Sequence, residues 1–68
     1  MKTYLIGYDN VPGEPLTAFV ALAETKSKYV AMFIRDSYRD AYKRSGISTE
    51  VKIVDPKELK SFRYAEDV

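Results

Sequence analysis

The stretch that decides the fold is KSKYVAMFIRDSYRDAYKRSG, residues 26–46. At about 100° per residue its charged side chains gather into one polar strip, while apolar side chains occupy the rest of the circumference. Asp40 in this strip precedes Arg44 by four residues, a spacing at which opposite charges pair. The pattern predicts a long helix over about residues 26–45, with a strip made of Arg35, Asp36, Arg39, Asp40 and Lys43.

Both ends of this helix carry capping signals. Thr25 is predicted to cap the first turn, with Ser27 as the alternative two residues later. At the other end, Gly46 suits the left-handed residue that follows a helix, and Ile47 is placed to fold back on Tyr42. We therefore expect the helix to stop near residue 45.

The apolar arc of this helix is wider than a single packing surface requires. It spans roughly 220°, against the 100° or somewhat more that one sheet face covers. Its members are Tyr29, Val30, Ala31, Phe33, Ile34, Tyr38, Ala41 and Tyr42. We expect part of this arc to need a second cover.

Two strands are predicted before the helix. Residues 2–9 are apolar on both faces, as a central strand with two neighbours would be. Residues 16–24 (LTAFVALAE) alternate along a second strand, and the stretch between them offers Pro12 and Gly13 for a type II turn. The pair is predicted to form an antiparallel hairpin.

Two further elements follow the helix. Residues 49–54 (TEVKIV) alternate between apolar and charged side chains, which predicts a third strand at an edge of the sheet. Asp55, Pro56 and Glu58 then have the order of a helix start, so we predict a short helix over about residues 56–62 and a frayed end beyond Tyr64.

The order of these elements predicts a two-layer α+β sandwich in a single domain, residues 1–68. A right-handed crossover through the helix makes the third strand parallel to the second, so the first strand lies antiparallel between them in the order two-one-three. The order one-two-three is the alternative. The full prediction is a ββαβα chain, with a three-stranded sheet on one long helix plus a short C-terminal helix.

Composition excludes several functions. The 68 residues include no cysteine and no histidine, which removes disulfides, thiolate or imidazole metal sites and the usual nucleophile and base pairs. A net charge of +1 gives no general attraction to nucleic acid or anionic lipid. No stretch has the pattern of a signal peptide or a membrane helix, so we expect a cytoplasmic protein without a cofactor.

The sheet face away from the long helix needs a cover. If Leu5, Val20, Leu22, Val51 and Ile53 lie under the helix, some of Tyr4, Ile6, Tyr8 and Phe19 point away from it. The C-terminal segment, through Leu59, Phe62 and Tyr64, is one cover. A protein partner or a second copy is another, and single-stranded nucleic acid stacked on the aromatic rings is a third.

Asp9 ends the first strand, and two roles compete for it. Its carboxylate suits the turn that follows, because Asp bonds the backbone of a turn that it opens. The stretch YLIGYD also resembles the first strand of the ferredoxin-like ribonucleases related to the CRISPR adaptation nuclease, in which an aspartate helps to hold a metal. Here a Pro-Gly hairpin follows where that family has a helix, so we assign Asp9 to the turn and disfavour a metal-dependent nuclease.

These patterns favour a non-enzymatic module that binds a protein or forms a homodimer. Binding to single-stranded nucleic acid through an aromatic sheet face is the alternative. The size is typical of phage or mobile-element regulators and inhibitors of host proteins. The predicted contact residues are Tyr4, Tyr8, Phe19, Tyr29, Met32, Phe33, Arg35 and Arg39.

Overall fold

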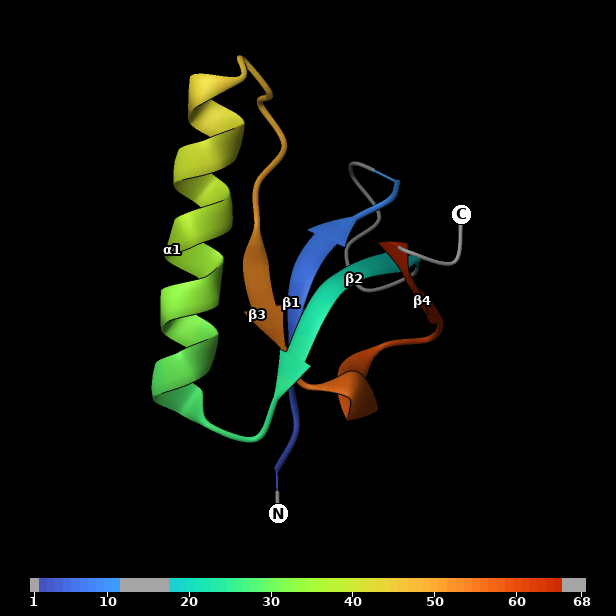
Figure 1. Ribbon diagram of the computed structural model, residues 1–68. Helices are drawn as coiled ribbons and strands as arrows, with labels where there is room; N and C mark the ends of the chain where they lie inside the picture. The colour runs from blue at the N-terminus through green and yellow to red at the C-terminus, as the bar shows by residue number, and fades with distance from the viewer. Residues whose placement is uncertain (1, 12–17, 66–68) are drawn as a thin grey trace.

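The computed structural model describes residues 2–11 and 18–65. Its elements, in chain order, are β1 (Tyr4–Asp9), β2 (Phe19–Thr25), α1 (Lys28–Arg44), β3 (Lys52–Val54), a 3₁₀ turn η1 (Pro56–Glu58) and β4 (Phe62–Tyr64). In Figure 1 α1 stands on one side of the sheet, and η1 and β4 lie on the other. The fold is therefore α+β, with one long helix against a mixed sheet. In the described part of the chain, no helix combines the length and apolarity that crossing a membrane requires.

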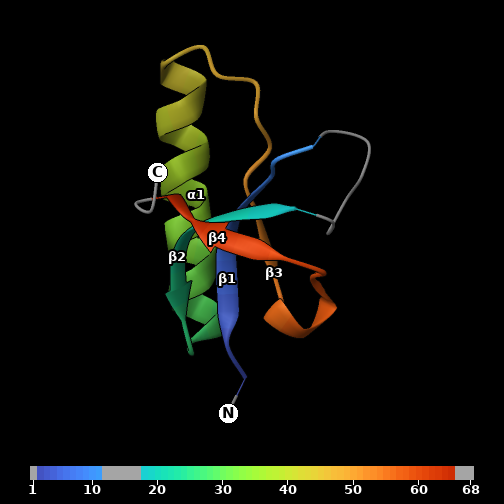
Figure 2. The same ribbon diagram turned by 90° about the vertical axis from the view of Figure 1, so that its right-hand side faces the viewer.

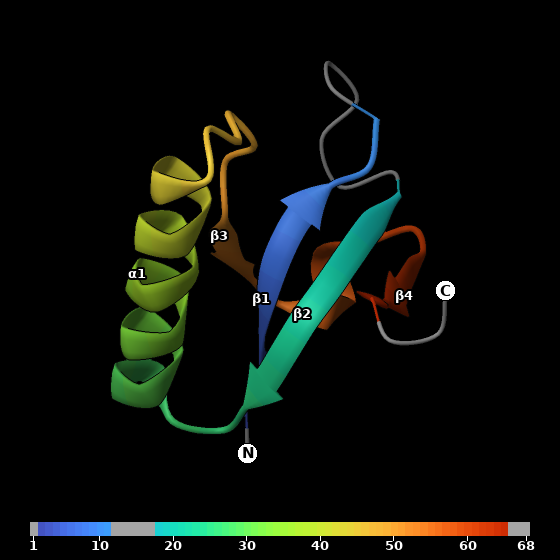
Figure 3. The same cartoon turned by 45° about the horizontal axis from the view of Figure 1, so that its top comes forward.

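The sheet has four strands in the order β3-β1-β2-β4. β1 pairs antiparallel with both β2 and β3, as predicted, and β2 pairs parallel with β4 (Figure 3). The central place of β1 explains its apolar residues on both faces, since Leu5 and Ile6 are both fully buried. The fourth strand was not predicted and extends the expected sheet beyond β2.

The predicted C-terminal helix over residues 56–62 is wrong. Asp55 caps a turn as expected, its Oδ1 accepting from the Lys57 amide at 2.9 Å, but the helical residues end at Glu58. The chain is then extended and forms β4, which pairs with β2 at the edge of the sheet and lies away from α1 (Figure 2). A helix this short is marginal by itself, whereas a strand satisfies backbone groups of β2 and covers the ring of Phe19.

The helix α1 begins at the alternative cap. Ser27 Oγ accepts from the Val30 amide at 3.3 Å, while Thr25 Oγ1 accepts from the Ser27 amide at 3.2 Å. The prediction for the C-terminal end of α1 is confirmed. Gly46 has a φ of 73°, and the amide of Ile47 donates to the Tyr42 carbonyl at 2.8 Å.

The remaining strands are shorter or shifted relative to the sequence prediction. β2 is found over Phe19–Thr25 rather than 16–24, and the predicted Pro12–Gly13 turn lies outside the described residues. β3 covers only Lys52–Val54 of the predicted 49–54, and it does lie at an edge of the sheet.

Two apolar clusters hold the layers together. The cluster on the α1 side centres on Ile6, Ala31 and Val51. The cluster on the opposite face contains Leu5, Phe19, Ala21 and Val54, with Leu59 and Tyr64 packed against it. The C-terminal segment is therefore the cover of the second face, one of the three covers considered from the sequence.

The prediction that Leu5 lies under the helix is wrong, and Tyr4 and Ile6 occupy the helix side instead. Register decides this, because Ile6 stands directly opposite Ile53 and the two side chains must share a face. Alternation along a single strand shows which residues share a face but not which face meets the helix.

Candidate functional site

The three aromatic residues predicted to bind through the sheet do not share an open face. Phe19 is only 1% exposed and lies in the cluster beneath the C-terminal segment. Tyr4 packs against the cluster on the α1 side, where the Lys2 ammonium sits 5.5 Å from its ring centroid. Tyr8 is half-buried at the end of β1. The described structure thus offers no joint stacking surface of these rings.

The first two turns of α1 carry the two most exposed large apolar side chains of the described residues. Tyr29 is 83% exposed and Phe33 is 72% exposed, and they stand one helical turn apart. Val30 and Met32 beside them are also exposed. We call these four residues, Tyr29, Val30, Met32 and Phe33, the outer helix patch. Of the four, only Val30 was missing from the predicted contact residues, although it belongs to the predicted apolar arc.

The position of the outer helix patch follows from the helical period. Ala31, Ile34 and Tyr38 follow one another at spacings of three and four and face the sheet. Tyr29 and Phe33 are themselves four residues apart, and at 100° per residue they point roughly away from that line. The sheet therefore covers only part of the 220° arc, and the excess predicted from the sequence lies on the solvent side of α1.

The two arginines predicted to bind a partner have partners within the chain. Arg39 Nε donates to the Val51 carbonyl oxygen at 2.8 Å, which links α1 to the segment entering β3. Arg35 Nε donates to Asp36 Oδ1 at 3.0 Å. Only the Arg39 guanidinium therefore links two parts of the domain, since the contact of Arg35 is with its exposed neighbour on the same helix.

Charged residues of both signs flank the patch. Lys26 and Lys28 are exposed before it in the chain, and the exposed charged residues that follow it on α1 are Asp36, Arg39, Asp40, Lys43 and Arg44. Asp40 Oδ2 pairs with Arg44 at 2.5 Å, with side chains 57% and 79% exposed respectively. Ion pairs this exposed contribute little and exchange partners easily. The i, i+4 spacing of this ion pair could be seen in the sequence, whereas the exposure of the two side chains could not.

The sheet edges are poorer contact surfaces than the helix. The two outermost strands, β3 and β4, have three residues each. The β1–β2 pairing shifts register between Ile6 and Gly7, which bends β2. That shift lies between the two inner strands, whereas the shortness of the edge strands opposes the addition of a foreign strand. In the described residues the outer helix patch is thus the best-formed exposed apolar surface.

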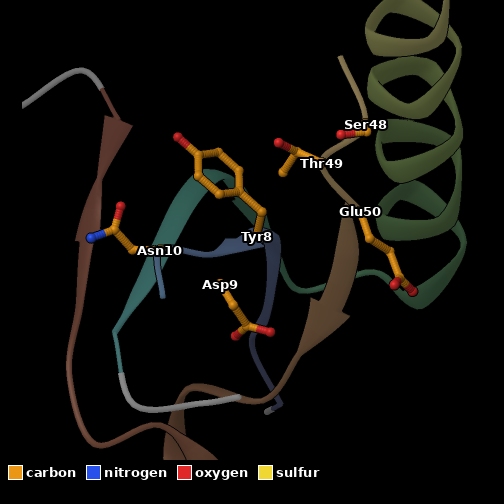
Figure 4. Close-up of a pocket in the computed structure, with 6 residues that line it drawn as sticks. All are labelled: Tyr8, Asp9, Asn10, Ser48, Thr49 and Glu50. Atoms are coloured by element: carbon orange, nitrogen blue, oxygen red, sulfur yellow. The ribbon is translucent and has the colours of Figure 1, made fainter. Parts of the chain in front are cut away.

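A pocket of about 480 Å³ lies where β1 ends beside the segment entering β3 (Figure 4). Its lining residues are Tyr8, Asp9, Asn10, Ser48, Thr49 and Glu50. Figure 4 shows Tyr8 and Asp9 pointing to opposite sides of the strand, so they do not converge on one point. No pattern in the sequence predicted that these six residues line one pocket.

Asp9 pairs with a lysine on the neighbouring strand β3. Its Oδ2 accepts from Lys52 Nζ at 2.5 Å, and the two side chains are 20% and 28% exposed. Lys52 pairs with Gly7, so Asp9 is its diagonal neighbour across the β1–β3 ladder. Among residues 2–11 and 18–65, no group of three or more carboxylate, imidazole or thiolate side chains is placed to hold a metal ion.

Three tyrosines meet between α1 and the end of β1. The rings of Tyr38 and Tyr42 pack edge to face, with centroids 6.1 Å apart. Burial raises the pKa of the Tyr42 phenol, and the neighbouring Tyr8 and Tyr38 raise that pKa further. The phenol is therefore neutral near pH 7 and serves packing.

Comparison of the chain with protein-family models, curated proteins and solved structures finds no match in any of the three. Functional inference therefore rests on the geometry of the described residues.

Proposed function

We propose that this protein is a small non-enzymatic binding module that contacts another protein chain through the outer helix patch. The observation that carries the proposal is the exposure of Tyr29 and Phe33, 83% and 72%, one turn apart on the same side of α1. Large apolar side chains grouped at a surface and rimmed by charges are typical of protein contact sites.

The chemistry of the patch suits a protein partner. Aromatic rings bury large areas while few side-chain torsions are immobilised, so they are frequent among residues that dominate binding energy. Tyr29 and Phe33 are fixed to a well-capped helix, which holds both rings at a constant spacing. A flat apolar helix face of this kind docks against another helix or an apolar groove.

Nucleic acid is a weaker candidate for the same patch. Acidic Asp36 and Asp40 stand among the basic side chains that border the aromatic rings, so the rim offers phosphates no continuous cationic strip. The rings that the sequence suggested for base stacking, Tyr4, Tyr8 and Phe19, lie in three different settings. A single-stranded oligonucleotide is thus a suitable negative control for binding.

Site-specific photo-crosslinking in cells that naturally carry the gene tests the proposal. The photoreactive residue p-benzoylphenylalanine replaces Phe33 in one variant and Phe62 in another, because Phe62 is also an exposed aromatic residue but lies on β4. We expect a discrete protein adduct from position 33 and none from position 62. The adduct should disappear when Tyr29→Ser is added. Adducts that ignore Tyr29→Ser, or no adduct at position 33 in a folded variant, would contradict the proposal.

A further inference from the structure

We propose that the protein bound by the outer helix patch is acidic and places carboxylates against Lys26 and Lys28, the two exposed lysines beside Tyr29 at the N-terminal end of α1. The inference rests on the proposed function, since it names the chemistry of the partner for the same surface. Apolar side chains of the partner cover Tyr29 and Phe33, while its carboxylates balance a positive charge that the domain itself leaves unbalanced.

The first argument is the surplus of positive charge on α1 and the residues that lead into it. Residues 26–44 carry six basic side chains and two acidic ones, a net charge of +4, whereas the whole chain has a net charge of +1. The rest of the chain is therefore negative, at −3. The helix shown on the outer side of the sheet in Figure 1 is thus the positive layer of the molecule. Charge separated in this way attracts a partner of opposite sign.

The charges in the C-terminal half of α1 are mostly accounted for within the domain. Asp36 and Asp40 each pair with an arginine of the same helix. Arg39 donates to the Val51 carbonyl oxygen. Lys43 lies in the last turn, where the negative end of the helix dipole stabilises a cation.

Lys26 and Lys28 have no such partners among the described residues. None of the three ion pairs found there includes either lysine. Glu24, the acidic residue that precedes them, accepts from the Tyr64 hydroxyl on β4 instead. The first turn of α1 contains no acidic residue. The unbalanced positive charge therefore lies at the end of the helix that carries Tyr29.

The second argument is that this placement opposes the stability of α1. The N-terminal end of a helix has a partial positive charge, because its first amide groups have no partners within the helix. Acidic side chains stabilise this end, and basic ones do the opposite. Residues that lower local stability are frequent at binding sites, where function requires them. Two lysines beside two exposed aromatic rings therefore point to an anionic partner.

A protein fits this surface better than a membrane or a nucleic acid does. At 100° per residue, Asp36 and Asp40 follow Phe33 on the same side of α1. A bilayer surface or a phosphate backbone presents negative charge along its whole length, and beyond Phe33 it would meet ion pairs that are already neutral. A protein can concentrate its carboxylates at the lysine end of the patch alone.

Fluorescence anisotropy with labelled amphipathic peptides measures the preference for an acidic partner. Two peptides of about 20 residues share leucines at helical spacing, and their polar positions are all glutamate in one and all lysine in the other. We expect the full chain to bind the glutamate peptide at least about tenfold more tightly, with an affinity that falls between about 0.05 and 0.5 M NaCl. Equal affinities for the two peptides overturn the inference.

Substitutions of Lys28 locate the binding. Lys28→Glu should weaken binding of the glutamate peptide at least about fivefold, whereas Lys28→Arg keeps the charge and should keep the affinity. Lys60→Glu is the matched control, because it changes the net charge equally at an exposed lysine between η1 and β4, on the side away from α1. It should change the affinity less than about twofold. Equal losses for Lys28→Glu and Lys60→Glu would show an effect of net charge alone and overturn the inference.

A stability measurement distinguishes a binding role of Lys28 from a structural one. Because Lys28 opposes the helix dipole, Lys28→Glu should raise the midpoint of urea denaturation by about 0.3–1 M while it weakens peptide binding. A lower midpoint would show that Lys28 supports the fold, and the argument from its unfavourable position would be refuted together with the inference.

Crosslinking at position 33 separates this inference from the proposed function. With p-benzoylphenylalanine at that position, adding Lys28→Glu should abolish the protein adduct, and mass spectrometry should find an Asp-rich and Glu-rich segment at the crosslink. A protein adduct that Lys28→Glu does not diminish overturns the acidic partner and retains the protein-binding function. No protein adduct in a folded variant overturns both. Tighter binding to phosphatidylglycerol vesicles or to a single-stranded oligonucleotide than to the glutamate peptide assigns the lysines to a membrane or a nucleic acid, and also overturns the inference.

Discussion

Gly7 occupies the point at which β1 and β2 approach too closely for any side chain. A Cβ at this position would lie 1.9 Å from the carbonyl oxygen of Val20 and 2.9 Å from the ring of Phe19. Because the nearest atom belongs to the backbone of β2, a rotamer change cannot relieve the clash. The register shift between Ile6 and Gly7 falls at the same place.

Gly7→Ala should therefore destabilise the domain more than Gly46→Ala does. Overpacking typically costs about 1–3 kcal/mol of unfolding free energy, and a clash with backbone belongs at the upper end of that range, a large share of the stability of a small domain. At Gly46 an added Cβ meets nothing within 4 Å, so only the left-handed φ of 73° costs energy, about 1 kcal/mol. Urea denaturation followed by circular dichroism measures both, and equal losses would show that β1 and β2 can separate at Gly7.

The ion pair of Asp9 with Lys52 should contribute to the free energy of unfolding. The two side chains are mostly buried at the margin of the β1–β3 ladder, so their attraction is screened less than on an open surface. In a double-mutant cycle with Asp9→Asn and Lys52→Met, we expect a coupling energy of about 1 kcal/mol that falls in about 1 M NaCl. Strictly additive losses in urea denaturation would show that the ion pair is energetically neutral.

At the scale of elements, β4 is the cover that the sheet needs on its second face. Its residues Phe62–Tyr64 pair in parallel with Phe19–Ala21, and the Tyr64 hydroxyl donates to Glu24 Oε1 at 2.9 Å. The rings of Phe62 and Tyr64 also pack edge to face, with centroids 5.8 Å apart. Three residues without neighbours would not form a strand, so β4 depends on β2 for its existence.

Truncating the chain after Lys60 should expose Phe19 and abolish cooperative unfolding. The loss removes the strand that covers that ring, and the apolar surface left behind should bind the dye ANS and promote aggregation. Tyr64→Phe is the matched control, since it keeps the ring and removes the hydroxyl that donates to Glu24, at a cost of about 1 kcal/mol. A truncated chain with the unfolding midpoint of the full chain would refute the role of β4.

At the scale of the whole molecule, the contact between helix and sheet is linked to pH through Tyr42. Its folded-state pKa is raised above the ordinary value of 10.0, so above that pH the unfolded chain loses its phenolic proton before the folded chain does. The stabilisation is fully present below pH 10 and is lost as pH rises through the raised pKa.

Tyr42→Phe should consequently flatten the alkaline side of the stability profile. Urea denaturation between about pH 8 and pH 11 should show a steeper fall in unfolding free energy for the wild type than for the variant. Tyr29→Phe is a suitable control, because its side chain is 83% exposed. Profiles of equal slope for Tyr42→Phe and the wild type would contradict the proposed linkage.

The amino-acid sequence by itself determined the features that depend on near neighbours. The helix α1, its glycine stop at Gly46, the ion pair of Asp40 with Arg44 and the capped turn at Asp55 all arise from interactions within about four residues. The sequence also predicted the central place of β1, because a strand that is apolar on both faces must be covered on both. The excess width of the apolar arc correctly predicted that α1 has more apolar surface than the sheet covers.

Only the tertiary structure decided where that excess lies and which residues remain exposed. β4, the face assignment of β1 and the burial of Phe19 depend on strand register between residues more than 40 positions apart in the chain. A one-residue change in register moves every side chain to the other face, and local patterns contain no information that selects between the two. For the same reason the sequence could not separate Tyr4, Tyr8 and Phe19 from Tyr29 and Phe33 as predicted contact residues. Packing of the sheet against α1 and the C-terminal segment leaves Tyr29 and Phe33 as the most exposed aromatic pair.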